Sequence, residues 1–352
     1  MIKIENNINK IEADHWNAFD SLNPFMKYNF LKFFNNSQKH VKHWYILSKN
    51  IRIYANSFSF DFSKFLNYGG VTLYNILFRF FSLKVLYFNN SFLTNISFFH
   101  SSLSTVSFEN ILRKINRHIN FHIIVIPEPL FKKLDLNKPV FRIEIESDMI
   151  LKINKKWNNI EDYKSNLKTK YRKKINIIEK KSNTISIYTI PSNEYCKYSS
   201  DIQKLFNNIF TNTSFSGPLF NTIIFKEMIK SNQLKLDGYF LNNVLVAFST
   251  EMHLNNDMYS YFVGFDKVLN KSYSLYARIL LEQISRAILL KRNNLILGRT
   301  ANEFKSNFGA VARKSYVWIH IPNIILNKFL YPFLCNIKLK TWKQRSPFKN
   351  LV

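Results

Sequence analysis

The chain has 352 residues, of which 46% are hydrophobic and 16% aromatic, with only 7 Gly and 9 Pro. This length suggests two domains of ordinary size, and the composition excludes a disordered, fibrous or low-complexity chain. The net charge of +27 favours anionic partners such as nucleic acid, anionic lipid or the phosphates of a cofactor, although scattered Lys with frequent Asn, Ile and Phe also arises from AT-rich codons.

The two cysteines, Cys196 and Cys335, lie far apart and in no metal-ligand spacing, so the sequence predicts neither a disulfide framework nor a metal site. The N-terminus has no apolar h-region, and no uninterrupted apolar run of about 20 residues occurs, so we expect no signal peptide and no spanning helix. We therefore expect a cytoplasmic protein. Aromatic residues beside basic ones leave room for peripheral contact with a membrane.

The first part of the chain predicts strands and helices in an α/β order. Asn23-Pro24 starts a new helix with Pro24 in its first turn, and Phe30, Leu31 and Phe34 form its buried stripe. Further elements follow in order: a hairpin over 43–55, a strand-like stretch over 83–99, a helix over 108–119 and a buried strand over 121–127.

A clear strand signal over 139–153 marks the second part of the chain. Its apolar and polar residues alternate, with Glu144 and Glu146 on the polar side. We place a domain boundary between Leu134 and Asp148, which divides the chain into 1–140 and 141–352.

A long amphipathic helix is predicted over 159–181. Its apolar stripe repeats at spacings of three and four and consists of Ile160, Tyr163, Leu167, Tyr171, Ile175 and Ile178. Five cations crowd its middle, namely Lys168, Lys170, Arg172, Lys173 and Lys174. They form either a solvated face or an anion-facing cluster, in which Arg172 and Lys173 are candidates to bind a substrate phosphate.

An antiparallel meander follows. We expect a strand over 184–190, helices over 202–210 and 222–231, three strands over 236–241, 244–254 and 258–264, a helix over 272–291 and a strand over 295–297. Asn242-Asn243 suits the positive dihedral angles of a two-residue hairpin turn. This order indicates an α+β fold with helices packed on the faces of a largely antiparallel sheet.

The strand over 295–297 ends at Gly298, and Arg299, Thr300, Glu303 and Lys305 follow within two turns of backbone. Sites in α/β proteins are often built where a buried strand delivers polar side chains to a loop. The alternative is a strand–loop joint with solvated charges or a structural ion pair such as Arg299 with Glu303.

Glu251 follows an apolar run inside the meander. A carboxylate that points inward from such a strand should have a perturbed ionisation, so Glu251 is a candidate general base.

Several short motifs resemble one family of bacterial proteins. They are Trp16, Asn23-Pro-Phe, Phe30-Leu31, Asp162-Tyr163, Lys170-Tyr-Arg-Lys-Lys174, Val263-Gly264, Leu297-Gly-Arg-Thr-Ala301, Glu303, Lys305 and Gly309. The chain resembles the double-GNAT acyltransferase-like proteins often called BioF2-like or peptidoglycan biosynthesis/recognition proteins. These are similar in architecture to the Fem-type peptidyltransferases that add amino acids to cell-wall precursors.

The resemblance implies two tandem GNAT-like domains, of which the first is degenerate and the second carries the site. It also implies acyl transfer from acyl-CoA or aminoacyl-tRNA, used as a co-substrate with no permanently bound cofactor, to an amine acceptor, with catalytic roles for Glu251, Glu303 and Lys305. Arg299 and Thr300 would bind substrate. Backbone N–H groups of Val263, Gly264 and Phe265, together with the helix start at Ser272, would hold the carrier.

One departure opens an alternative. The loop over 266–275 contains no glycine, whereas the usual GNAT loop at this place is glycine-rich, so a pyrophosphate cradle is in doubt. The doubt concerns acetyl-CoA more than acyl transfer. The chain is then either an acyltransferase with a CoA or tRNA donor, or a non-catalytic binding protein that keeps the fold. We find no DNA-binding motif, and a nucleic-acid partner other than tRNA would rest on charge alone.

Overall fold

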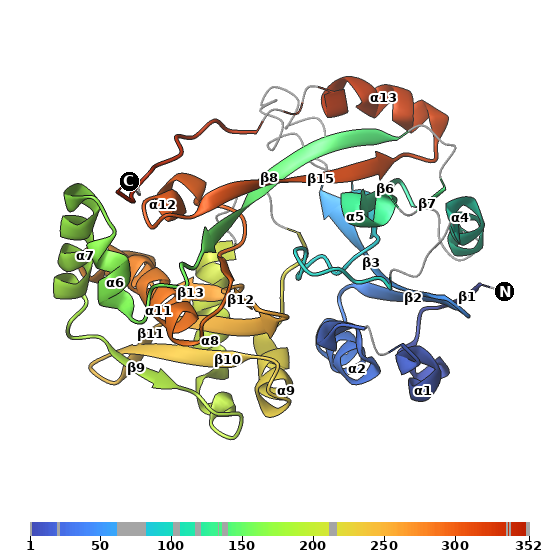
Figure 1. The fold of residues 1–352 in the computed structure, drawn as a ribbon. Coiled ribbons are helices and arrows are strands. Elements are labelled where there is room, and N and C mark those ends of the chain that lie inside the picture. The colour runs from blue at the N-terminus through green and yellow to red at the C-terminus, as the bar shows by residue number, and fades with distance from the viewer. Residues whose placement is uncertain are drawn as a thin grey trace. The chain divides into compact units, whose positions relative to one another are not determined.

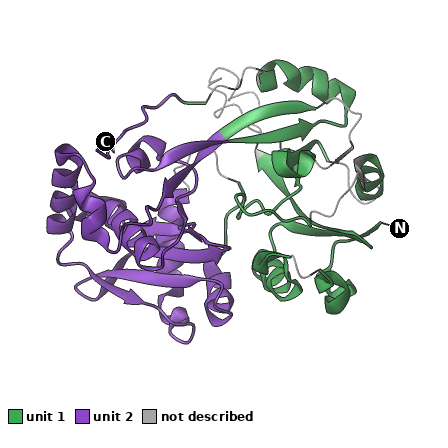
Figure 2. Cartoon of the chain, in the orientation of Figure 1, with its two compact units in different colours: residues 1–145, 214–221, 315–340 green, residues 146–213, 222–314, 341–352 purple. Residues whose placement is uncertain are grey.

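The computed structural model describes residues 2–19, 22–61, 82–100, 106–116, 121–132, 134–135, 140–210, 217–335, 337 and 339–349. The chain forms two compact units, and neither is continuous in sequence (Figure 2). Unit 1 comprises residues 1–145, 214–221 and 315–340, and unit 2 comprises residues 146–213, 222–314 and 341–352. These units differ from the sequence-based division at 140/141, because a late segment of the chain belongs with the N-terminal unit.

Unit 1 is built on a mixed, mostly antiparallel sheet (Figure 1). Its strand order is β1-β2-β3-β4-β6-β15, and only the pair β4 and β6 is parallel. The strands are β1 (Lys3–Glu5), β2 (Lys42–Ser48), β3 (Ile51–Asp61), β4 (Ser82–Tyr87), β6 (Ile123–Pro127) and β15 (Val311–His320). Beside them lie a parallel pair, β5 (Val106–Ser107) and β7 (Leu134–Asp135), and the helices α1 (Ala13–Asn17), α2 (Tyr28–Ser37), α4 (Phe108–Asn116), α5 (Glu128–Phe131) and α13 (Ile324–Cys335).

Unit 2 is likewise built on mixed, mostly antiparallel strands. Its strand order is β8-β14-β12-β11-β10-β9, with β13 paired to β11, and only the pair β12 and β14 is parallel. The strands are β8 (Phe141–Lys152), β9 (Ser186–Thr189), β10 (Lys235–Leu241), β11 (Val244–Leu254), β12 (Asp257–Tyr259), β13 (Val263–Phe265) and β14 (Asn294–Ile296). The helices are α6 (Ile160–Ser165), α7 (Thr169–Lys181), α8 (Tyr195–Phe210), α9 (Phe225–Lys230), α10 (Lys267–Tyr273), α11 (Leu275–Leu289) and α12 (Asn302–Ser306).

The two units repeat one order of elements. Each has a strand (β1 or β9), two helices, a three-strand meander (β2–β4 or β10–β12), a crossover helix and a strand (β6 or β14) parallel to the last meander strand. The predicted α+β architecture, a largely antiparallel sheet with packed helices, is therefore confirmed, and its order of elements is repeated once in each unit.

The closing strands of the two sheets are exchanged in sequence. Strand β8 follows the first repeat along the chain, but its second half pairs with β14 of unit 2. Strand β15 follows the second repeat, but its second half pairs with β6 of unit 1. This exchange is the reason that no single cut of the sequence separates the units.

Local sequence explains several elements. Asn23 accepts hydrogen bonds from backbone N–H groups of the 3₁₀ turn Pro24–Met26, and the stripe predicted from Phe30, Leu31 and Phe34 is buried. In unit 2, Asn242 and Asn243 adopt φ of 48° and 63° between β10 and β11, which is the predicted hairpin turn.

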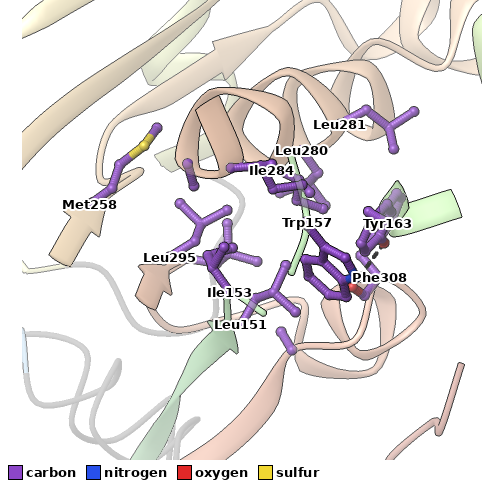
Figure 3. Packing of buried hydrophobic residues seen from close by; sticks show 14 of the residues in the cluster. Leu151, Ile153, Trp157, Tyr163, Met258, Leu280, Leu281, Ile284, Leu295 and Phe308 are labelled. Carbon is purple, nitrogen blue, oxygen red and sulfur yellow. Dashed lines mark hydrogen bonds between the residues drawn. The ribbon is translucent and has the colours of Figure 1, made fainter. Parts of the chain in front are cut away.

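The core of unit 2 lies between the sheet and the helices α6, α7 and α11 (Figure 3). Leu151 and Leu295 from β8 and β14 pack against Ile284 and other apolar residues of α11. Tyr163 is fully buried, and its hydroxyl donates to the carbonyl of Phe308 at 3.0 Å, which ties α6 to the chain after α12. Unit 1 has two separate cores of its own.

The helix predicted over 159–181 is broken. Helix α6 ends at Ser165 and α7 begins at Thr169, while the predicted apolar stripe still faces the core. The break arises because the C-terminal segment pairs there: Lys168 N–H donates to Pro347 at 2.8 Å, and Lys349 N–H donates to Asn166 at 2.9 Å.

Two further elements differ from the predictions. The strand predicted over 258–264 is interrupted between β12 and β13, and the helix predicted over 272–291 begins earlier, as α10, and bends at Ser274, whose φ is 52°. Within the described part of the chain, no helix is long and apolar enough to cross a membrane.

Candidate active site

In unit 2, the last meander strand leaves its parallel neighbour partway along. Strand β12 pairs with β14 from Asp257 to Tyr259, and Ser260 N–H still donates to the Ile296 carbonyl at 3.0 Å. Beyond Ser260, β13 pairs with β11 alone among the described strands. This strand therefore splays away from β14, and no described strand pairs with the other edge of β13.

The hydrogen-bonding pattern between β11 and β13 determines which N–H groups of β13 face the edge that no described strand pairs with. Asp266 N–H donates to Val246 at 2.9 Å, and Thr250 N–H donates to Phe262 at 2.9 Å. Since hydrogen-bonding direction alternates along a strand, the N–H groups of Val263 and Phe265 point to the open edge and that of Gly264 points to β11. The prediction that Gly264 offers its N–H to a carrier is thus corrected.

Gly264 is needed for a different reason. A Cβ added there would lie 2.7 Å from the backbone carbon of Leu205 and 2.8 Å from the backbone nitrogen of Phe206. The glycine therefore lets helix α8 lie directly against β13.

The loop that follows β14 is conformationally strained. Gly298, Thr300 and Ala301 have φ of 69°, 66° and 50°. Positive φ is a true outlier for a β-branched residue such as Thr300, and outliers of this kind concentrate at functional sites. The loop lies at the strand end where the sequence predicted the site.

Lys305 donates side-chain hydrogen bonds to the backbone of this loop. Its side chain is buried, with 3% of the residue exposed, and Nζ donates to the carbonyls of Gly298 at 3.2 Å and Arg299 at 2.7 Å. Burial lowers the pKa of Lys305 to about 7, against the carboxylates of Glu146 and Asp148, which favour the charged form. A neutral amine that donates both hydrogens to these two carbonyls keeps one lone pair.

Two acidic residues of β8 complete the cluster. Asp148 is 3% exposed, and its carboxylate lies 3.3 Å from Arg299 Nε and 3.8 Å from a guanidinium nitrogen of Arg313. Burial raises the pKa of Glu146, while Lys305, Arg299 and the backbone N–H of Thr300 act in the opposite direction. The cluster thus brings Lys305, Arg299 and Thr300 together, as predicted, and adds two carboxylates.

The pKa of Lys305 predicts a pH-dependent stability. The folded protein releases this proton near pH 7 and the unfolded chain near 10.5, so between these values the unfolded state binds more protons and stability rises with pH. Relative to Lys305→Met, the wild-type protein should gain about 1.4 kcal/mol in unfolding free energy per pH unit over this window. Urea denaturation of both proteins from pH 6 to about 9 measures the difference. If the unfolding free energies of the two proteins changed with pH in parallel, the lowered pKa of Lys305 would be contradicted.

Glu251 lies outside this cluster. Its carboxylate accepts hydrogen bonds from His253 Nε2 at 2.7 Å and Arg286 Nε at 3.1 Å. Burial raises the pKa of Glu251, but these two partners outweigh it and hold the pKa below its usual value. A carboxylate held ionised by the Arg286 guanidinium and a hydrogen bond from His253 is a poor proton acceptor, so the geometry favours a structural ion pair over the predicted base.

Glu303 is also paired, although not with Arg299. Its carboxylate accepts from Arg345 Nε at 3.1 Å, and this hydrogen bond lowers the pKa of Glu303. The ion pair between Arg299 and Glu303 that the sequence left open is not formed, because Arg299 turns to Asp148 instead. Glu303 fastens the C-terminal segment to α12.

Arg172 and Lys173 lie on the exposed face of α7 with the neighbouring cations Lys168, Lys170 and Lys174. The sequence left open a solvated face or an anion-binding one, and exposure is compatible with both. Lys174 Nζ reaches Asn307 Oδ1 at 3.4 Å, so this basic face borders the end of α12.

The start of the crossover helix is already capped from within the chain. Asp266 accepts from the N–H groups of Val268 at 2.8 Å and Leu269 at 2.9 Å, and Asn270 accepts from the N–H of Tyr276 at 2.9 Å. Ser272, predicted to face a pyrophosphate, lies inside α10 and not at a helix start. A carboxylate at this cap disfavours a second anion at the same place.

A row of aromatic rings crosses the open side of the splay. Phe265 stacks on Tyr276 and Tyr276 on Phe304, each with ring centroids 5.4 Å apart, and Phe308 follows at 5.6 Å. Phe304 is 41% exposed. Sequence analysis missed this row, because its members come from β13, α11, α12 and the segment after α12, and share no local pattern.

Sequence analysis also missed Glu146 and Asp148 as site residues. The predicted alternation placed Glu146 on the polar side of β8 and did not include Asp148. The position of both residues opposite Gly298 depends on the pairing of β8 with β14, seen in the hydrogen bond from Met149 N–H to the Gly298 carbonyl at 3.0 Å. Among the described residues, no group of His, Cys, Asp and Glu could hold a metal ion.

No protein-family model matches the chain, and no curated protein is significantly similar to it in sequence. Solved structures share its fold. FemX is similar with a TM-score of 0.51 over 91% of this chain and 98% of that chain, at 9% identity. A conserved protein of unknown function from Bacteroides thetaiotaomicron VPI-5482 is similar with a TM-score of 0.50 over 91% of this chain and 100% of that one, at 11% identity. The fold of the chain is therefore similar to that of FemX along nearly its whole length.

Proposed function

We propose that the chain is an N-acyltransferase in which Lys305 accepts the proton of the attacking amine. The observation that carries this proposal is the buried Lys305, which donates to the strained loop directly after β14, the strand from which the meander strand diverges beyond Ser260. A GNAT-like fold with this splay leaves backbone N–H groups beside the site, which suits acyl transfer.

In the proposed reaction, the nitrogen of a neutral amine attacks the carbonyl carbon of an activated acyl group. The N–H groups of Val263 and Phe265 face the open edge and would orient the acyl carrier and stabilise the developing oxyanion. The lone pair of Lys305 takes the proton that the amine loses, and the ammonium passes a proton to the departing oxygen or sulfur as the carrier bond breaks. Glu146 and Asp148 stabilise the ammonium form of Lys305 in the meantime.

An aminoacyl-tRNA is the donor that we propose. Its ester needs no pyrophosphate cradle, and Asp266 makes the start of α10 unfavourable for one. The exposed cations of α7 supply a basic face for a phosphate backbone, and the partly exposed Phe304 offers a ring on which a base can stack. The acceptor is proposed to be an amine of a cell-envelope precursor, on the strength of the Fem-like fold and the resemblance in sequence.

Ligand-dependent stability separates the donors. With aminoacyl-tRNA at 100 times its dissociation constant, the unfolding free energy should rise by about 2.7 kcal/mol. Acetyl-CoA and longer acyl-CoA should give no shift. Replacing Arg172 and Lys173 by serine should weaken the tRNA effect and its salt dependence, whereas the matched pair Lys180→Ser and Lys181→Ser, at the far end of α7, should not. A shift with acyl-CoA alone would overturn the choice of donor.

The second candidate function is a non-catalytic binding protein. The occupied caps at Asp266 and Asn270 favour it, because they fit a chain that has lost the carrier loop of an acyltransferase. This protein would show no transfer of a radiolabelled amino acid from tRNA to any amine, and no stabilisation by acyl-CoA or aminoacyl-tRNA.

A further inference from the structure

Helix α13 of unit 1 is apolar on both of its faces. It contains 12 residues, and Lys328 is the one charged residue among them. Its inner face packs on the core through Leu326, Leu330 and Leu334. Helices that are apolar all round are normally buried in a protein or in a membrane. We therefore expect the outer face of α13 to be covered by another molecule.

That outer face is exposed. The fractions exposed are 71% for Ile324, 77% for Ile325, 44% for Phe329 and 54% for Tyr331. Among the described residues of unit 1, the one other large apolar side chain that is exposed is Leu219. Single exposed apolar residues are ordinary, but here four gather within two turns of one helix. Tyr331 lies beside Phe141, which places α13 along the start of β8 (Figure 1).

The chain around α13 carries charge of one sign. In residues 315–340, the segment of unit 1 that contains α13, the sequence has three Lys and no Asp or Glu. On the unit 1 side, Lys328 lies on the outer face itself and Lys340 is exposed after the helix. Such lysines can extend their ammonium groups to headgroups while their stems stay among apolar groups.

We propose that α13 docks unit 1 onto the surface of an anionic lipid membrane. An apolar helix face of Ile, Phe and Tyr with flanking Lys and no acidic residue matches the interfacial layer of an anionic bilayer, where acyl chains meet negative headgroups. A second copy of this chain fits the face less well, because a two-fold contact brings identical positive charges together. The inference does not depend on the chemistry proposed for Lys305.

Vesicle flotation with the full chain tests the proposal. The wild-type protein should bind vesicles that contain phosphatidylglycerol, should bind phosphatidylcholine vesicles weakly, and should lose affinity as salt rises. Replacing Ile325 and Phe329 by serine should reduce binding about tenfold or more, since two exposed side chains no longer enter the bilayer. These side chains are exposed, so the variant should fold. The matched control replaces Ile177 and Leu289 by serine. Both are exposed apolar residues on helices of unit 2, so this variant should bind vesicles as the wild type does.

A local probe adds a second readout. Lipids with brominated acyl chains should quench the fluorescence of Phe329→Trp more strongly than that of Leu289→Trp. Equal binding by the Ile325/Phe329 variant and the wild type, or no binding to anionic vesicles at all, would overturn the proposal. So would self-association in the absence of lipid that the Ile325/Phe329 variant abolishes, because the occupant would then be a second copy.

Discussion

Replacing Lys305 by methionine is expected to lower kcat for acyl transfer by roughly 10²–10⁴-fold, the range that a positioned proton acceptor contributes. Methionine keeps much of the apolar volume and removes the amine, which donates to the carbonyls of Gly298 and Arg299. Transfer of a labelled amino acid from tRNA to an amine, measured under single-turnover conditions, reports the chemical step without product release.

The substitution Lys305→Arg distinguishes two roles of Lys305, namely accepting a proton and hydrogen bonding to the loop. Arginine can donate to the same two carbonyls, but it stays protonated, so this variant should keep the loop and still lose the chemical step. Lys180→Met removes an exposed lysine of α7 and serves as the matched control, with unchanged kcat. Full activity of Lys305→Arg, together with an unaltered pH–rate profile, would assign Lys305 a positioning role instead.

Gly309→Ala is expected to destabilise the protein by about 3–5 kcal/mol. Gly309 has φ of 92°, and an added Cβ would lie 2.2 Å and 2.5 Å from two ring carbons of Phe348. That ring packs on Trp157 and Tyr163, with centroids 5.6 Å and 5.9 Å away, so its displacement opens the core beneath α6.

Gly298→Ala is the matched control for this substitution. Gly298 also has positive φ, 69°, but an added Cβ would meet nothing within 4 Å. Its cost should therefore be the backbone strain alone, about 1 kcal/mol. Urea denaturation at fixed pH compares the two variants, and equal midpoints would show that Phe348 does not resist the new methyl group.

Features with a local cause were predictable from the sequence. The turn at Asn242-Asn243, the cap at Asn23 and the strand that ends at Gly298 each depend on neighbouring residues, and each is present. The break at Asn166 was not predictable, because it depends on Lys349 from the far end of the chain.

The same distinction applies to the candidate site. Its loop and Lys305 follow β14 directly in sequence, so sequence reasoning could single them out as candidates. Asp148 was missed because only the pairing of β8 with β14 brings it to Arg299, and no residue near either one encodes that pairing. Glu251 was a candidate base because its burial was foreseeable from the apolar run before it. Its ion-pair partners, His253 and Arg286, were not foreseeable.

The exchange of closing strands has a consequence for synthesis on the ribosome. The sheet of unit 1 needs β15 beside β6, so it stays incomplete until His320 has left the exit tunnel, although β1, β2, β3, β4 and β6 all precede residue 128 in the chain. Until then β6 presents an unpaired edge, which invites pairing with other chains. The usual order, in which the N-terminal domain folds first, is thereby reversed, and the nascent chain completes its first repeat only after making nearly all of its second.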